Sequence, residues 1–395
     1  MSQSLPATAQ HPAKASLKTI KLGQKNTTLW QSYQNKKAST PMLFPTEGAA
    51  TLGVSEFELI LASPHSQYMG GQCRAVLEQL QDFAQVESIV RNDLAVHEKT
   101  AQYHNLKLGD NMGIALNVGG LDLRFFMKRW QHMLVVTDMT RMDKPSYGIQ
   151  FYDEQGSAID KVFLRDMSAE AITRWQDMIQ QQVASVDQDI LMLEVKETAA
   201  DWQYKVLTDD NRDKLQRRWQ KMTDIHQFYH ILNKLEIDRA SSYRQAPEGA
   251  AYPLSIDAVE AVFNQACDSE CPIMIFVGNS GMVQIQTGTI KTIKRMGDWI
   301  NILDKNHNDF TLHLKDKALA QVWCVQRPTA DGFVTCIEGF DNKGVTIFTL
   351  FGQRIEGTSE LEVWRTITAN IVSEYAIDAT QVSTPTYAES QTETA

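Results

Sequence analysis

The sequence has little cysteine and no long apolar run. Its five cysteines in 395 residues are an odd number at irregular spacing, which is not the pattern of a disulfide framework, and free thiols suit a reducing cytosol. The N-terminal segment lacks the apolar core of a secretory signal, and runs such as IMIFV are far too short to span a bilayer. The sequence therefore predicts a soluble cytoplasmic protein without stable membrane association.

Positive charge is also scarce. Lys and Arg total 38 against 48 Asp and Glu, giving a formal net charge of −10. Generic binding to nucleic acid requires neutralisation of phosphates, so this balance argues against a DNA-binding regulator built on the helix-turn-helix-like stretch AATLGVSEFELILA. The sequence contains no flavin or NAD fingerprint, so any reductant must come from outside the chain.

What the chain does contain is an internal repeat. Residues 28–205 and 206–377 each show helical patterns, then strand patterns, then a closing helix, whereas the polar segments 1–27 and 378–395 are expected to be disordered tails. FYDEQG in the first half resembles GFDNKG in the second. This comparison matches Trp130, Asp153 and Trp175 with Trp299, Asp341 and Trp364, and it requires an insertion of about twenty residues in the second half.

The repeat predicts the fold class. We expect an α+β protein made of two similar halves, each with a large antiparallel sheet and a group of helices. A duplicated fold leaves a cleft between its halves, and such clefts commonly bind ligands.

Two of the nine histidines, His226 and His230, lie one helical turn apart in TDIHQFYHIL, within a predicted helix over 209–235. Three interpretations are open for His226. It could be a hydrogen-bonded histidine at the edge of the core. It could be a zinc ligand together with His230, but such a site needs a third ligand and usually has a Glu at the position of Gln227. An axial ligand of haem iron would suit an aromatic, Met-rich face and would need Arg or Lys for the haem propionates.

Longer segments carry a further resemblance: TDIHQFYHIL, IDRASSYRQAP, GNSGMVQIQTGTI, MGDWINILD and LFGQRIEGT, with AVHEK and LDLRFFMKRW in the first half. Together they resemble the haemin-degrading factor family, the tandem-repeat cytoplasmic haem-utilisation proteins of the HemS/ChuS type. The resemblance covers roughly residues 28–370. It implies two α+β halves whose antiparallel sheets form a central saddle, with one haem bound in a cleft between them.

The resemblance also implies the site. His226 would be the axial ligand of haem b (iron protoporphyrin IX), and Arg124 would lie on the opposite side with Phe126 behind it; His226 and Arg124 would be the catalytic residues. The other haem-binding positions that it implies are Arg239, Arg327, Phe351 and Arg354. The family often has Lys where this chain has Arg327, which keeps the charge, and Tyr where it has Phe351, which loses a hydroxyl group.

The sequence leaves two haem functions open. One is oxidative ring opening with an external electron donor, and the other is a carrier that stores or delivers haem without catalysis. The expected partners are haem and a haem-receiving protein or an external reductase, and the chain is expected to be a monomer or homodimer. His230 and His97 are candidates for an alternative or second haem ligand, although a surface and an interface histidine are the simpler interpretations.

Overall fold

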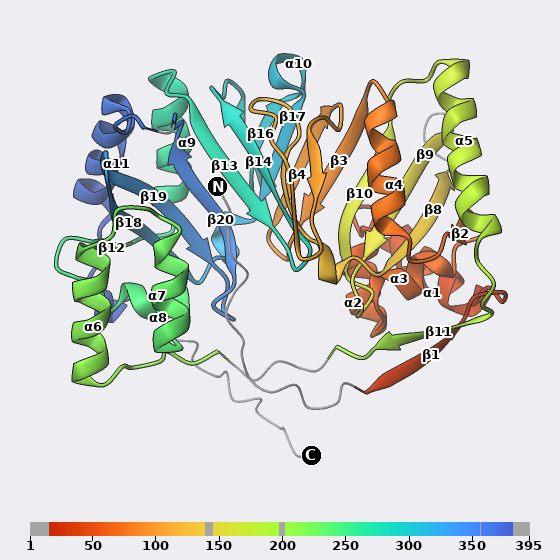
Figure 1. The fold of residues 1–395 in the computed structure, drawn as a ribbon, viewed down its shortest axis with the longest axis horizontal. Helices are drawn as coiled ribbons and strands as arrows, with labels where there is room; N and C mark the ends of the chain where they lie inside the picture. The colour runs from red at the N-terminus through yellow and green to blue at the C-terminus, as the bar shows by residue number, and fades with distance from the viewer. Residues whose placement is uncertain (1–15, 139–144, 197–201, 356, 382–395) are drawn as a thin grey trace.

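The computed structural model describes residues 16–138, 145–196, 202–355 and 357–381. Two nine-stranded antiparallel sheets dominate these residues (Figure 1). The first sheet has the order β15 (Ile293–Met296), β16 (Trp299–Asp304), β17 (Phe310–Leu314), β4 (Ala95–Ala101), β3 (Val86–Arg91), β10 (Ala158–Leu164), β9 (Ser146–Tyr152), β8 (His132–Asp138), β2 (Ser66–Tyr68). The second has the order β12 (Ala251–Leu254), β18 (Gln321–Thr329), β19 (Gly332–Phe340), β20 (Thr346–Gly352), β13 (Ile273–Gly278), β14 (Met282–Gly288), β7 (Asp122–Phe126), β6 (Met112–Ala115), β5 (Leu106–Leu108).

The two halves exchange strands. β5, β6 and β7 belong to the first half but extend the second sheet, where β7 pairs with β14. β15, β16 and β17 extend the first sheet in the same way, where β17 pairs with β4. Asn92 donates side-chain hydrogen bonds to two carbonyl groups of the second half, and Asn279 donates to two of the first. The halves are therefore related by an internal pseudo-two-fold symmetry, and each sheet contains strands of both.

Helices cover both faces of each sheet (Figure 1). α4 (Cys73–Gln79) and α5 (Ala169–Ala184) pack on one face of the first sheet, and α3 (Glu56–Leu61) packs on the other, next to α1 (Thr27–Ser39) and α2 (Pro45–Leu52). In the second half α9 (Ala258–Asp268) and α11 (Glu362–Tyr375) lie opposite α6 (Asp209–Gln220), α7 (Gln227–Leu235) and α8 (Arg239–Tyr243). Strands covered on both faces, such as IMIFVG of β13, are apolar without alternation.

The predicted α+β tandem repeat is confirmed, and two of its three residue matches hold. Asp153 and Asp341 close equivalent turns, because the Oδ1 atom of each accepts the backbone N–H groups two and four residues later. Trp175 of α5 and Trp364 of α11 are both fully buried against equivalent sheet faces.

The match between Trp130 and Trp299 is wrong. Trp130 follows β7, whereas Trp299 begins β16 after a hairpin turn. The equivalent of Trp130 is Leu319, which follows β17 and is also buried. Leu319 lies as far from Trp130 along the chain as Trp364 lies from Trp175. The predicted match relied on similar residues around each tryptophan. With Leu319 as the equivalent residue, the alignment of the two halves does not need the expected insertion of about twenty residues.

Three further expectations change. Leu17–Lys21 (β1) pairs with Ile190–Glu194 (β11), so the expected N-terminal tail contains a strand, whose Ile20 is buried. The expected helix over 209–235 is broken by a turn at 221–226 between α6 and α7. The helix-turn-helix-like stretch does form α2 and α3 around Gly53 (φ 67°), but α3 is six residues long and mostly buried, so it cannot enter a DNA groove.

Candidate functional site

The predicted residues Arg124 and Phe126 lie on β7, where strands of the first half join the second sheet. Arg124 stands opposite Val283 of β14, and residues two apart on a strand share a face, so Arg124, Phe126 and Val283 lie on one face. Phe126 and Val283 belong to a buried cluster with residues of α6, α7 and α8. This face, called the α7 face below, therefore combines side chains of both halves.

The α7 face is aromatic and aliphatic next to Arg124. The rings of Phe276 and Phe351 meet edge to face, with centroids 5.3 Å apart, and Met274 stands opposite Phe351. All three are in the same cluster as Phe126. Phe351, which the resemblance assigns to the haem pocket, is thus part of an apolar wall and contacts Phe276.

Arg124 is held by its own strand. Its Nη1 atom donates to Asp122 Oδ1 at 2.5 Å and to the Leu123 carbonyl oxygen at 3.0 Å, and both charged side chains are almost completely buried. Burial raises the pKa of Asp122, and the Arg124 guanidinium opposes that rise. The pair fixes the guanidinium at one end of the α7 face.

His226 lies in the turn before α7, at the helix N-cap position. Its Nδ1 atom is 2.5 Å from Asp224 Oδ1, and its backbone N–H donates to the same oxygen at 2.7 Å. The bond from the backbone N–H, and to a lesser extent that from the side chain, holds the pKa of Asp224 below its usual range. Burial has the opposite, smaller effect. The His226 side chain is 39% exposed, and its neighbour Ile225 packs on the cluster of the α7 face. The imidazole is therefore fixed at the edge of this face and accessible.

Arg239 and Arg327 belong to one buried ionic network. Arg327 is 4% exposed, and its Nη2 atom donates to Glu338 Oε1 at 2.8 Å and to the Tyr243 hydroxyl at 2.5 Å. Tyr243 in turn donates to Glu338 Oε2 at 2.7 Å, and Arg239 contacts the same oxygen at 3.2 Å. Burial by itself raises the pKa of Glu338, but Arg239 and Arg327 outweigh it and lower that pKa to about 2. The network ties α8 to β18 and β19.

The two arginines differ in access. The Arg239 side chain is 24% exposed, so it can also meet a ligand. Arg327 stacks on the ring of Phe228, 4.5 Å from its centroid, and an anion could reach its bonded Nη2 atom only by displacing Tyr243 or Glu338. Arg354, just after β20, is partly exposed, and its Nε atom is buried without a hydrogen-bond partner among the described residues.

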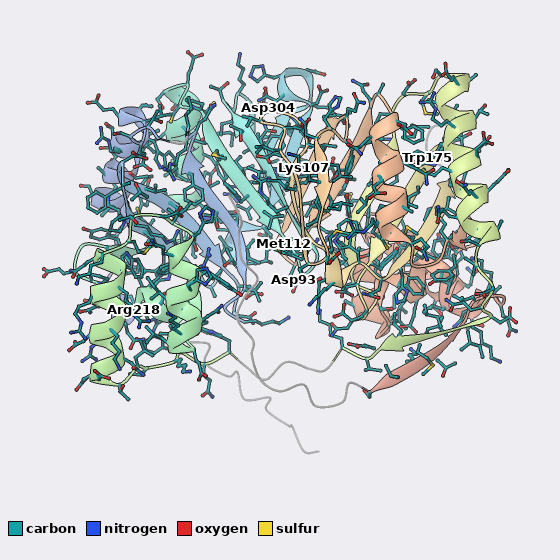
Figure 2. All side chains as sticks on the ribbon, viewed as in Figure 1. Asp93, Lys107, Met112, Trp175, Arg218 and Asp304 are labelled. Carbon is teal, nitrogen blue, oxygen red and sulfur yellow. The ribbon has the colours of Figure 1, made fainter. Side chains whose placement is uncertain are left out.

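Sequence reasoning missed three charged residues. Asp224 and Asp122 lie two residues before His226 and Arg124, within the quoted motifs. A carboxylate two residues before a candidate site residue is the sequence signal that indicates them. Lys107 continues the α7 face to its edge, because Arg124 is opposite Ile114 and Ile114 is opposite Lys107. Figure 2 shows exposed Lys107 and Met112 in the middle of the molecule, where strands of both halves meet.

The other histidine candidates lie elsewhere or are less constrained. His97 of β4, left open as a second haem ligand, is fully buried against the ring of Phe310, so a ligand cannot reach it in this conformation. His230 is exposed on α7 beside Tyr229, with ring centroids 5.6 Å apart. In the described ranges, no group of three or more His, Cys, Asp or Glu side chains could hold a metal ion, so the zinc interpretation finds no ligand set there.

A separate cavity of about 560 Å³ lies between α4 and α5 of the first half. Its lining includes Gln72, Gln79, Gln181 and Gln188, and none of the seven predicted site residues. We therefore assign the candidate site to the α7 face. In the part of the chain that the structure describes, no helix is both long and apolar enough to cross a bilayer.

The fold thus combines two repeats that exchange strands with a turn, just before α7, that carries His226. The model of the haemin-degrading HemS/ChuX domain matches the chain twice, at residues 53–182 and 236–371. The chain belongs to this family.

Curated relatives and solved structures agree with this assignment. The chain is 34% identical over 353 residues to the hemin transport protein HmuS of Yersinia pestis, covering 88% of this chain and 98% of that protein. The haem-degrading enzyme ChuS of Escherichia coli O157:H7 is similar in structure, with a TM-score of 0.76, 29% identity and coverage of 88% and 99%. The haem-bound form of PhuS, a haem-binding protein from Pseudomonas aeruginosa, gives a TM-score of 0.78, 30% identity and coverage of 87% and 98%.

Proposed function

We propose that this chain binds one haem on the α7 face, with His226 as the axial ligand, and serves bacterial haem uptake and iron acquisition. The observation that carries the proposal is the accessible His226 imidazole, held through Nδ1 beside an aromatic face to which both halves contribute. The names of the relatives support the same ligand, since they include a haem-binding protein and a haem-degrading enzyme.

The chemistry of the α7 face fits haem b. A porphyrin has two broad apolar faces, and their burial against Phe126, Phe276 and Phe351 would supply most of the affinity, at about 25 cal/mol per Å² before ordering costs. Its two propionates need cationic groups. Arg354 and Arg239 are the accessible guanidinium groups from the predicted set, and Lys107 adds a positive charge at the edge.

Two roles are proposed for the remaining arginines. Arg327 would act mainly by holding Glu338, Tyr243 and Arg239 in place, with direct propionate contact after exchange of one of its bonds. Arg124 would lie across the ring from His226. Bound haem would supply a redox-active iron, and the Arg124 guanidinium, oriented by Asp122, would donate hydrogen bonds to a small molecule bound there.

Haem titration tests the binding proposal. Purified protein should take up one haem per chain and develop a Soret band, and His226→Ala should shift that band and weaken binding. His230→Ala is the matched control, since His230 lies four residues further along, on α7, and is exposed. An unchanged spectrum in His226→Ala removes His226 as the ligand, and the absence of uptake by the native chain removes the function.

A second assay separates enzyme from carrier. The haem complex is given a reductant and O₂, with catalase present because free peroxide degrades haem without an enzyme. Cleaved tetrapyrrole and released iron identify a ring-opening enzyme that takes electrons from an external reductase in the cytoplasm. Intact porphyrin identifies a carrier that passes haem to a receiving protein. Arg124→Ala should abolish ring opening and leave binding through His226 in place.

A further inference from the structure

The turn that carries His226 is closed by side-chain hydrogen bonds. Asp224 Oδ1 accepts both the backbone N–H and the Nδ1 side of His226. The same turn is closed by Gln227 and Thr223. Gln227 Oε1 accepts the Thr223 backbone N–H at 3.0 Å, and Gln227 Nε2 donates to Thr223 Oγ1 at 3.2 Å. The Thr223 carbonyl oxygen also accepts the backbone N–H of Ala330, at the end of the hairpin between β18 and β19. Both flanks of the imidazole are thus fixed.

The Asp224 contact determines which ring nitrogen carries the proton. A carboxylate accepts a proton, so the neutral imidazole carries its hydrogen on Nδ1 and keeps the lone pair on Nε2. A carboxylate behind a metal-binding imidazole orients the ring and increases the basicity of the coordinating nitrogen. The Asp224 side chain is 56% exposed, and exposed ion pairs contribute little to folding, so the contact is expected to act on the ligand rather than on stability.

We propose that Asp224 is a positioning residue that makes His226 an electron-rich axial ligand, coordinating through Nε2. This inference rests on the proposed function. A more basic imidazole stabilises ferric over ferrous iron, so the carboxylate lowers the reduction potential of bound haem and strengthens the iron–imidazole bond. The native chain would therefore hold oxidised haem firmly and resist its reduction by a weak donor.

Asp224→Asn tests the proposal, because asparagine keeps the size and an oxygen acceptor for the His226 backbone N–H but removes the negative charge. The variant should have a higher midpoint potential, a lower iron–histidine stretching frequency in the ferrous complex, and haem dissociation faster by about tenfold to 100-fold. Asp209→Asn is the matched charge control, since Asp209 is an exposed carboxylate on α6 paired with Arg212.

The outcomes separate this inference from the proposed function. If Asp224→Asn reproduces the native potential and stretching frequency while His226→Ala loses the ligand, the positioning role is overturned and the haem site stands. If Asp209→Asn changes these readouts as much as Asp224→Asn, a general charge effect replaces the positioning role. If the native chain takes up no haem, or if His226→Ala leaves the haem spectrum and affinity unchanged, the proposed function itself fails.

Discussion

The guanidinium of Arg327 lies 2.8 Å from the carboxylate of Glu338, and both side chains are buried beneath α8. Removing one partner of such a pair leaves a charge without compensation in the interior. We therefore expect Glu338→Gln to lower the free energy of unfolding by about 3–5 kcal/mol, measured by urea denaturation.

An exposed pair provides the control for this prediction. Arg174→Gln breaks the pair with Glu170 on the surface of α5 and should cost less than about 1 kcal/mol. The double variant Arg327→Met, Glu338→Leu should lose less stability than the sum of its single variants. Additive losses would contradict a coupled network.

A buried histidine should set part of the acid sensitivity of the fold. Burial lowers the pKa of His97 from 6.5 to about 3, so the unfolded chain binds one more proton than the folded chain between these values. Stability is then complete above pH 6.5 and falls as the pH decreases, by about 1.4 kcal/mol per pH unit from this group.

His97→Gln should remove one such contribution, and Gln284, fully buried at the equivalent position of the second half, shows that the fold accepts a buried glutamine there. The free energy of unfolding, measured from pH 7 to pH 4, should depend less steeply on pH in the variant. His132, whose pKa burial lowers to about 4, accounts for a remaining slope. An unchanged slope would refute the prediction, and exposed His104→Gln provides the neutral comparison.

A close approach between the halves should be sensitive to a single methyl group. A Cβ atom on Gly281 would lie 2.5 Å from Ile159 Cδ1, and the Gly281 carbonyl oxygen accepts the indole N–H of Trp130. Gly281→Ala should lower the free energy of unfolding by about 1–3 kcal/mol. Thermal unfolding of the double variant Gly281→Ala, Ile159→Ala should show a smaller loss than the two changes added. Gly23→Ala, where no atom lies within 4 Å, should be neutral.

Propionate recognition can be separated from ring burial. Arg354→Gln should weaken haem binding by about tenfold, since a charge-assisted hydrogen bond contributes about 1.5–3 kcal/mol and this site is partly exposed. Binding of the dimethyl ester of haem, which has no anionic propionate, should not change. Equal losses for haem and the ester would show that Arg354 acts through packing.

Local chemistry made parts of the fold and site readable from sequence. The turns at Asp153 and Asp341 depend on side chains within four residues, and the motif around His226 is contiguous in the chain. The break between α6 and α7 was missed because it contains no Gly or Pro and is stabilised instead by side-chain bonds of Thr223, Asp224 and Gln227.

Non-local features could not be read in this way. The alternation of apolar residues identifies β7 as a strand, but it does not say that β7 pairs with β14 of the other half. Likewise, the position of Arg327 in a strand gives no sign of its burial. Its counter-charge Glu338 lies on the next strand, and its stacking partner Phe228 comes from a helix about one hundred residues earlier.

The exchange of β5–β7 for β15–β17 has a consequence for each half taken alone. An isolated C-terminal half would expose the edge of β14 and carry three strands with no sheet to join. Two copies of it would satisfy both needs by reciprocal swapping about a true two-fold axis. The present chain has the geometry of such a dimer fused into one polypeptide. Fusion allows the two copies to diverge: the second half carries the turn with His226, whereas the first half contributes β7, with Arg124, to the second sheet.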